Sequence, residues 1–406
     1  MRINNLTIRN IGPFKESEIE FLSDDDNKEF PPVIIITGEN GTGKSIILDS
    51  IRTLFMGVFE NVEREINASD DFLLKSTVTI NKTQKIELKS SQKNESRRFD
   101  NNHVEFSKLF HSQFDTIYKR DFIFEYWTSK LSNDKFEINN IQILNAKEYL
   151  NETLSGIHKN IDVTRTITFL DYLKDSKNSI ESEIGDVLFG LLEEIVNDSI
   201  SNGVLSHVSR INLTPLAKVQ GKEISLDKLS SGNLYLIQRY ISILKQVYSI
   251  CINNNIPIKD YKIVEGVILI DEAENHLHPK WQKVFLRNIL KLFPRIQIIV
   301  TTHSPFIVSS IENAKVFVCV DKIDHSEIIE ETDFYANLPI EEILRSPLFN
   351  TNSFNDDISE LIEKRKKAIK EEKSAVVKEI EEQLLTLNPE YFNYLKLDEV
   401  LKNLKK

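Results

Sequence analysis

Gly38-Glu39-Asn40-Gly41-Thr42-Gly43-Lys44-Ser45 is the stretch that decides the fold. It follows the apolar residues 33–36 and precedes a stretch at 46–51 whose apolar residues recur with a helical period. This order predicts a buried strand, a glycine turn and a helix, and the spacing fits the phosphate-binding loop (P-loop) G-x-x-x-x-G-K-[ST]. Glycines let successive N–H groups point at phosphate oxygens, and the helix adds its positive N-terminal end. We therefore expect ATP to bind at Asn40, Gly41, Thr42, Gly43, Lys44 and Ser45, with Lys44 on the β- and γ-phosphates and Ser45 on Mg²⁺.

The composition is that of an ordinary globular protein. The 406 residues are 40% hydrophobic and 28% charged, which is long enough for two or three domains. The formal net charge of -11 argues against a broadly basic nucleic-acid surface but allows a local basic patch. Cys251 and Cys319 lie in apolar surroundings, so we expect buried free thiols, as in a reducing cytoplasm. Since no apolar run reaches the ~18 residues of a membrane span and no secretory pattern is present, we expect a cytoplasmic protein without a membrane partner.

Two further strand ends carry residues suited to phosphate chemistry. The aliphatic strand at 267–270 ends in Asp271-Glu272, where the first carboxylate can hold Mg²⁺ and the second can act as general base on the attacking water. His303 follows the strand at 296–300, where an imidazole can point across the sheet edge toward a γ-phosphate. A lone histidine at such a place is more often structural, so its assignment depends on the other motifs.

A second phosphate grip is indicated at residues 229–233, Leu-Ser-Ser-Gly-Asn, which open a predicted helix. The N–H groups at this helix start can bind phosphate. Because the P-loop already has that role within one chain, the second grip makes sense if it faces the nucleotide of another subunit.

Periodicity indicates the remaining elements. Strands are expected at 3–9, 17–21, 77–80, 85–88, 122–127, 208–216 and 314–320. Helices are expected from the P-loop to about residue 59 and over about 151–202, 234–250 and 279–293. Alternating strands and helices predict a parallel or mixed sheet covered by helices. The charged tail from about residue 353 predicts a helical hairpin with a break at Pro389.

The order GENGTGKS, LSSGN, VILIDEAENHLHP, IIVTTHSPF resembles the ABC-type ATPase head shared by SMC, RecF and related DNA-maintenance proteins. In that family two heads sandwich two ATP molecules. The resemblance implies that residues 41–45 bind one ATP and that Ser230 and Gly232 complete the site on the other subunit. It further implies that Asp271 and Glu272 are the Mg²⁺ and catalytic carboxylates and that His303 is the switch histidine. Residues 275–278 would form the subunit-crossing D-loop, and Arg9 and Asn10 would approach the nucleotide.

The resemblance also implies a fold class and boundaries. We expect an α/β ABC-ATPase head with a mixed or parallel nucleotide-binding sheet, an antiparallel ribbon, an inserted helical subdomain and a C-terminal helical tail. The expected domains are the first half of the head with the P-loop at 1–60, a ribbon or lid region at 61–150, a helical insertion at 151–204, the second half of the head with the signature, Walker B, D-loop and H-loop at 205–322, and a helical segment at 323–406.

Residues 271–311 are especially similar to compact ATPases of prokaryotic anti-phage systems of the Septu PtuA type. This implies an ATP-hydrolysing sensor or regulatory subunit that dimerises through an ATP sandwich and controls a separate effector. No clustered acidic strand ends follow His303, so a nuclease effector is expected to be a separate protein. The expected types are HNH and TOPRIM. The alternatives are a DNA-repair or recombination ATPase of RecF/SMC type, which would carry a long coiled coil or basic groove, and a scaffold that binds ATP without turnover.

Two departures from the family pattern leave contacts open. The signature ends in Asn233, where Gln or Glu is usual. The glutamine loop could use Gln92, Gln113 or Gln142, and residues 126–130 are a candidate for the strand segment that bears it.

Overall fold

The computed structural model describes residues 1–23, 30–56, 68–92, 102–103, 105–106, 109–110, 120–128, 138–144, 146, 162–200, 202–349 and 354–395. The chain divides into two compact units, Met1–Ile340 and Glu341–Lys406. Gln113, residues 129–130 and residues 151–161 of the predicted helical region lie outside the described residues.

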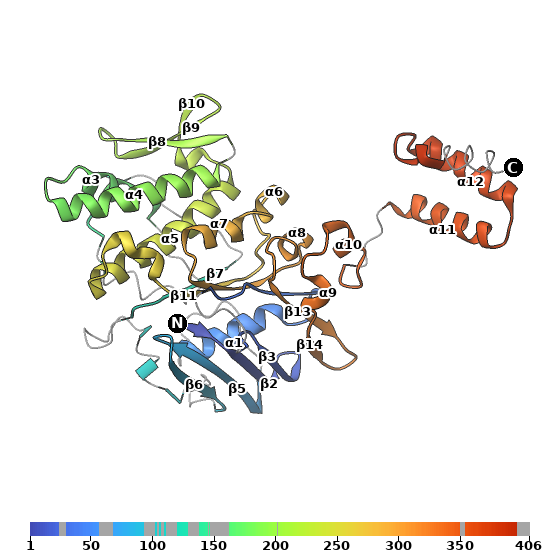
Figure 1. Cartoon of the computed structure of the whole chain (residues 1–406), viewed down its shortest axis with the longest axis horizontal. Coiled ribbons are helices and arrows are strands. Elements are labelled where there is room, and N and C mark those ends of the chain that lie inside the picture. The colour runs from blue at the N-terminus through green and yellow to red at the C-terminus, as the bar shows by residue number, and fades with distance from the viewer. Residues whose placement is uncertain are drawn as a thin grey trace. The chain divides into compact units, whose positions relative to one another are not determined.

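A six-stranded sheet runs through the centre of the first unit (Figure 1). Its strands lie in the order β14-β13-β4-β12-β11-β7. Its strands are β4 (Ile34–Gly38), β7 (Ile123–Trp127), β11 (Gly266–Ile270), β12 (Ile296–Thr301), β13 (Lys315–Asp321) and β14 (Ser326–Glu330). All neighbours pair in parallel except β14, which is antiparallel to β13. Strands β4, β7, β11 and β12 are buried along their whole length, as expected of parallel strands covered on both faces. The predicted α/β class with a mixed sheet is confirmed.

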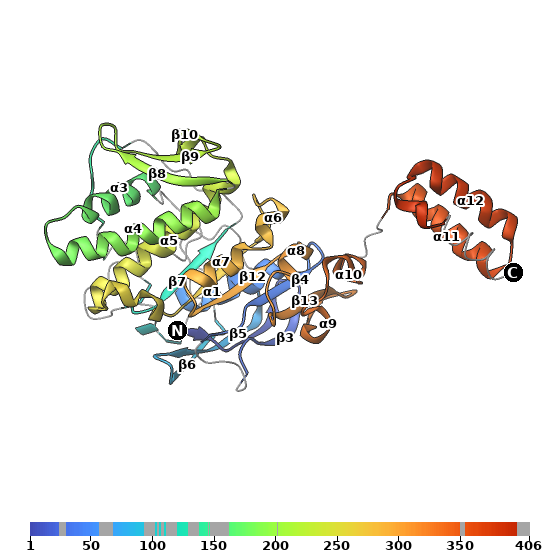
Figure 2. The same ribbon diagram turned by 45° about the horizontal axis from the view of Figure 1, so that its top comes forward.

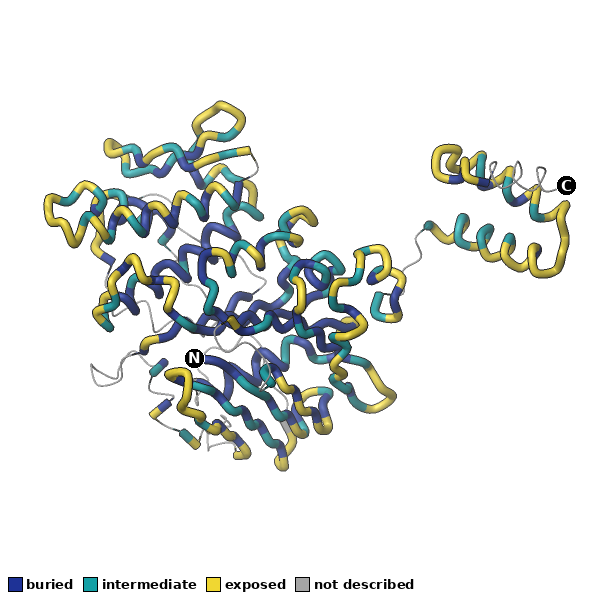
Figure 3. The backbone as a smooth tube through the Cα atoms, viewed as in Figure 1, coloured by how far each residue is buried: buried dark blue, intermediate teal, exposed yellow. Residues whose placement is uncertain are grey.

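A second, five-stranded antiparallel sheet contains the N-terminal hairpin and the ribbon. Its strands are β1 (Arg2–Ile3), β2 (Asn5–Ile11), β3 (Phe14–Glu20), β5 (Ala68–Ile80) and β6 (Gln84–Ser90). Helix α1 (Lys44–Met56) contacts strands of both sheets, and its apolar residues Ile47, Leu48, Ile51 and Phe55 are fully buried in one core with them. The dark tube of Figure 3 shows this buried layer. The P-loop helix is thus fixed between two sheets.

A helical lobe, which we define as α3 (Val163–Lys174), α4 (Ser179–Ser199) and the sheet of β8 (Gly203–Ser209), β9 (Thr214–Val219) and β10 (Lys222–Ser225), is inserted between the halves of the head (Figure 2). It leads through η1 (Leu226–Lys228) into the long helix α5 (Ser231–Asn254), which contacts both α3 and α4. Gly185 allows α4 to approach α3 closely, because a Cβ there would lie 2.3 Å from the Lys174 nitrogen.

Several local predictions differed from the structure. The predicted strand at 208–216 is two strands, β8 and β9, separated by a turn in which Leu213 has φ of +53°. The predicted helix at 279–293 is divided into α6 (Pro279–Gln282) and α7 (Phe285–Leu292), because Val284 has a non-helical φ of -120°. Strand β14, which extends the main sheet, was not anticipated from the sequence. Short helices η2 (Ile258–Ile263), α8 (Pro305–Val308) and α9 (Thr332–Tyr335) complete the connections.

The second unit is helical: α10 (Ile340–Arg345) at its start, then α11 (Asp356–Lys370), α12 (Ser374–Leu387) and η3 (Tyr391–Asn393). Its own apolar core contains Ile380, Leu384, Phe392 and Leu395. The predicted hairpin is present, but it turns at residues 371–373, where Glu372 has φ of +54°, and Pro389 follows the end of α12 instead. Among the helices that the structure describes, none has the length and apolarity that a membrane span requires.

Candidate active site

The P-loop runs from the buried end of β4 into α1. Gly38, Gly41 and Gly43 have φ of 143°, 83° and 93°, a backbone region that favours glycine. The turn between β2 and β3 lies against the loop, since a Cβ on Gly43 would be 2.7 Å from Pro13 and 2.7 Å from Phe14. Space for the loop is therefore available only with glycine at position 43.

Lys44 folds back on its own loop. Its ammonium donates to the carbonyl oxygens of Gly38 at 3.0 Å and Glu39 at 2.7 Å. Burial lowers the pKa of Lys44, and the nearby acidic groups, Asp271 and Glu272 among them, oppose that shift. A buried cation beside main-chain carbonyls is suited to exchange these weak acceptors for phosphate oxygens.

Asp271 joins three elements at the carboxyl edge of the main sheet. It follows β11 directly and is 1% exposed. Its Oδ1 accepts hydrogen bonds from Ser45 Oγ at the start of α1 and from Thr301 Oγ1 at the end of β12, each at 2.7 Å. The P-loop hydroxyl and the strand-end carboxylate are therefore brought together, although 226 positions separate them in the sequence.

Glu272 has a left-handed backbone, with φ of +51°. This region costs an L residue about 1–2 kcal/mol, so surrounding contacts must hold it. The Glu272 N–H donates to Thr301 Oγ1 at 2.9 Å, and Asn275 Nδ2 donates to Glu272 Oε2 at 2.6 Å. The backbone and the side chain of Glu272 are thus both held, which fixes the orientation of its carboxylate.

His303 is held through a residue that the sequence did not single out. The carboxylate of Glu274 accepts hydrogen bonds from the backbone N–H of His303 at 2.7 Å and from Thr302 Oγ1 at 2.6 Å. Burial and the charge of Lys44 lower the pKa of His303, so its neutral form predominates at pH 7. The signal for Glu274 was its spacing, two residues after Glu272 in a strand-end turn.

The predicted signature packs against the predicted D-loop of the same chain. Ser230 caps the N-terminus of α5. A Cβ on Gly232 would lie 2.4 Å from the carbonyl oxygen of His276, and the Tyr235 ring centroid is 5.6 Å from that of His276. His276 itself has φ of +63°. The start of α5 and the D-loop therefore form one closely packed surface.

The structure brings Lys44, Ser45, Asp271, Glu272 and His303 to one edge of the sheet. The other predicted P-loop residues lie beside them. Asn40 and Gly41 are exposed at the turn of the loop, and Thr42 Oγ1 donates to the Glu39 carbonyl at 2.9 Å. Ser230 and Gly232 lie at the D-loop, as described above.

The remaining candidates have other surroundings. On β2, Arg9 is exposed and Asn10 Nδ2 donates to Asp71 Oδ2 at 2.9 Å. Of the glutamine candidates, Gln92 and Gln142 are exposed. The end of β7 lies beside Asp271, whose N–H donates to the Trp127 carbonyl at 2.9 Å.

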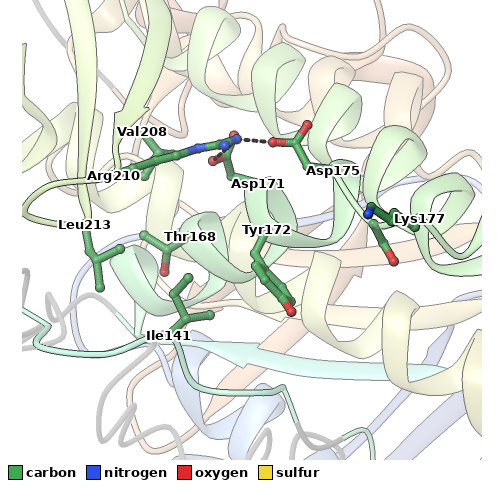
Figure 4. Close-up of a pocket in the computed structure, with 10 residues that line it drawn as sticks. Ile141, Thr168, Asp171, Tyr172, Asp175, Lys177, Val208, Arg210 and Leu213 are labelled. Carbon is green, nitrogen blue, oxygen red and sulfur yellow. Dashed lines mark hydrogen bonds and ion pairs between the residues drawn. The ribbon is translucent and has the colours of Figure 1, made fainter.

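A separate cavity of about 420 Å³ lies in the helical lobe, and none of its lining residues belongs to this edge of the sheet. Figure 4 shows Asp171 of α3 and Asp175, which directly follows that helix, facing Arg210 after β8. Arg210 donates to Asp175 and lies 3.5 Å from Asp171, so the two carboxylates share its charge.

Comparison with known proteins gives concordant results. Residues 33–309 match the family described as "AAA domain, putative AbiEii toxin, Type IV TA system". The "Retron Vc95 probable ATPase" of Vibrio cholerae serotype O1 biovar El Tor is 25% identical over 454 residues, covering 91% of this chain and 85% of that protein. The "Septu protein PtuA" of Bacillus thuringiensis is 25% identical over 297 residues, covering 68% of this chain and 67% of that protein.

Among solved structures, the SMC head bound to the C-terminal winged-helix domain of ScpA aligns with 84% of this chain and 99% of its own, at a TM-score of 0.50 and 13% identity. That likeness concerns the fold alone. Together these comparisons confirm a relationship to the retron and Septu defence ATPases and a fold like that of the SMC head.

Proposed function

The chain belongs to the AAA domain family AAA_21, and from this premise we propose that it is an ATP-binding and ATP-hydrolysing regulatory subunit of a bacterial anti-phage defence complex. Two copies would dimerise through an ATP sandwich and control a separate effector, a nuclease of HNH or TOPRIM type.

The observation that carries the proposal is the network of Ser45, Asp271, Thr301 and Glu272 beside Lys44. The residues fit ATP with Mg²⁺. A hydroxyl and a carboxylate oxygen 2.7 Å apart are ligands that Mg²⁺ prefers, and the N–H groups of the adjacent glycine loop are suited to phosphate. Mg²⁺ held there by Ser45 and Asp271 would offset negative charge on the phosphate oxygens.

The residues have distinct roles in the proposed hydrolysis. Lys44 exchanges its loop carbonyls for β- and γ-phosphate oxygens. The water oxygen bonds to the γ-phosphorus, the bond to the β–γ bridging oxygen breaks with its electrons left on ADP, and the water proton passes to Glu272. The left-handed backbone of Glu272 and its bond from Asn275 hold the base in place. Neutral His303 donates toward the γ-phosphate.

The sandwich is supported by the surface that Ser230 and Gly232 form with the D-loop. Ser230 is exposed and caps α5, so its helix start is open to a second molecule. We place Ser230 and Gly232 on the γ-phosphate of the ATP that the other head holds. Closure would then depend on ATP, and hydrolysis would release the heads and reset the effector.

Glu272→Gln tests the turnover step. The variant should retain ATP affinity, measured by equilibrium dialysis, and lose phosphate release by at least about 100-fold, because a general base contributes on that scale. Glu312→Gln, the same change at an exposed turn residue, is the matched control and should behave like the unmodified protein. Unchanged phosphate release in Glu272→Gln would remove that residue from its role.

The alternative of a scaffold without turnover is separated by the same assay. A protein that binds ATP but releases no phosphate above background, alone or with its partner, would be a scaffold. The effector is tested by the neighbouring gene: a small HNH or TOPRIM protein supports the defence role, and a permease contradicts it.

A further inference from the structure

Asn233 connects the signature to the helical lobe. Its side-chain carbonyl accepts a hydrogen bond from the Ser230 hydroxyl, and its amide donates to the Ser199 carbonyl oxygen at 2.7 Å. Ser199 is the last residue of α4 and is fully buried. The last carbonyls of a helix have no partner within it, so this amide satisfies a buried acceptor that α4 leaves open.

The position of Asn233 in α5 explains why asparagine makes different hydrogen bonds from the usual Gln or Glu. Ser230 is the N-cap of α5, so Asn233 is the third residue of the helix, N3. Gln or Glu at N3 reaches back to the backbone N–H of the N-cap and completes a local capping box. Asparagine is one methylene shorter, and here its two ends go to the Ser230 hydroxyl and the Ser199 carbonyl instead. Ser230 still caps α5 by accepting the Asn233 N–H, and the Asn233 amide adds a tertiary link to α4.

The Ser199 end of this link is itself firmly joined to the lobe. Asn197 Oδ1 accepts from the Leu205 N–H at 2.8 Å, which ties the end of α4 to β8. The other end of α4 is packed onto α3 at Gly185. A displacement of α4 would therefore move the Ser199 carbonyl, and through Asn233 it would change the orientation of the Ser230 hydroxyl.

We propose that Asn233 is a positioning residue that makes phosphate binding by Ser230 depend on the position of the C-terminal end of α4. This inference rests on the proposed ATP sandwich, in which Asn233 holds Ser230 and the start of α5 in the place where phosphate on the opposite head meets them. The helical lobe then acts on ATP-dependent closure without contacting nucleotide.

Two substitutions separate the link from the cap. Asn233→Asp keeps an acceptor for Ser230 but has no amide to donate to Ser199. Asn233→Gln restores the local capping box and draws the amide away from Ser199. Ser199→Ala is the control, because it removes a hydroxyl bonded locally to Ile195 and keeps the backbone carbonyl that the link uses.

Head association is measured by analytical ultracentrifugation with ATP, each change being placed in the Glu272→Gln background. Both Asn233 variants should weaken ATP-dependent association about tenfold, as the loss of one partly buried hydrogen bond predicts, while ATP affinity and the control stay unchanged. Association of Asn233→Gln or Asn233→Asp equal to that of the Glu272→Gln parent would overturn the proposal.

Hydrogen exchange without ATP tests the link independently of the sandwich. Asn233→Asp should speed exchange at residues 202–206, next to the end of α4, at least about tenfold, and leave the P-loop peptide and Ser199→Ala unchanged. No change at 202–206 refutes the link. If the Glu272→Gln parent itself stays monomeric with ATP, the sandwich fails, and the proposed coupling fails with it even where exchange shows the link to exist.

Discussion

Thr301→Val is expected to reduce ATP turnover while leaving the protein folded. The Thr301 hydroxyl is 1% exposed, donates to Asp271 Oδ1 at 2.7 Å and accepts the Glu272 N–H at 2.9 Å. Valine has nearly the same shape but no hydroxyl, so both bonds are lost at once. The Glu272 N–H, in a left-handed backbone, then has to find another acceptor.

The magnitude follows from these two bonds. A buried bond to a carboxylate and a buried N–H left without its acceptor are each worth on the order of 1–3 kcal/mol. Local relaxation recovers part of this, so we expect about 2 kcal/mol less stabilisation of the catalytic arrangement, which corresponds to about thirtyfold slower turnover.

The assay is steady-state phosphate release, with ATP affinity and thermal unfolding measured on the same samples. Thr301→Ser keeps the hydroxyl and loses one methyl group, so it should recover most of the turnover lost in Thr301→Val. A folded Thr301→Val protein with turnover within twofold of the parent would refute the argument that this hydroxyl holds the two carboxylate residues.

Three further changes address other parts of the site. Gly232→Ala places a Cβ 2.4 Å from the His276 carbonyl, so ATP binding should persist while turnover falls at least about tenfold in a phosphate-release assay. Ser230→Arg should likewise bind ATP but fail to associate or hydrolyse, and full activity of a monomeric variant would exclude the sandwich. Burial raises the pKa of Glu125 to about 7, so the folded state binds more protons than the unfolded state, and this contribution to stability falls as pH rises from about 4.5 to 7. Glu125→Gln should therefore lose less thermal stability than the parent between pH 5 and 8, measured as the change in melting temperature. The same change in both proteins would contradict the role of Glu125.

Much of the fold could be predicted because its signals are local. The P-loop, its strand and its helix are contiguous, and α1 begins at Lys44 as the motif requires. The end of β5 at 77–80, strand β6 and the buried strands β11 and β12 are short apolar or alternating runs bounded by polar residues, whereas the first part of β5 was not predicted. The turn at 210–213 was missed because its left-handed residue is Leu213, which is not a turn former.

The order of strands in the main sheet could not be read from the sequence. Strand β4 lies between β12 and β13, which follow it by more than 250 residues. Pairing over such a separation is decided by tertiary packing, and no local propensity encodes it. The same applies to β14, whose five residues, Ser-Glu-Ile-Ile-Glu, show no alternation of apolar and polar side chains.

The candidate site was predictable as a set of residues but not as a set of bonds. Asp271 and Glu272 are marked by their place at the end of an aliphatic strand. Thr301 carries no such mark, because threonine is common in strands and its bonds are to residues 29 and 30 positions earlier. The bonds of Glu274 could not be predicted either, because an acidic residue in a turn more often faces solvent.

Register explains how these unmarked residues enter the site. In the parallel pair of β11 and β12, Ile270 is opposite Val300, so the next residues, Asp271 and Thr301, come to the same edge together. A slip of one residue would set the apolar Val300 or the following Thr302 against Asp271 and turn alternate side chains to the opposite face. Gln297 of β12 opposes that slip, because its buried amide exchanges two hydrogen bonds with the main chain of Ile3 and a shift would break both. The core of the sheet therefore fixes which hydroxyl meets the Asp271 carboxylate, and through Thr301 it also fixes the strained backbone of Glu272.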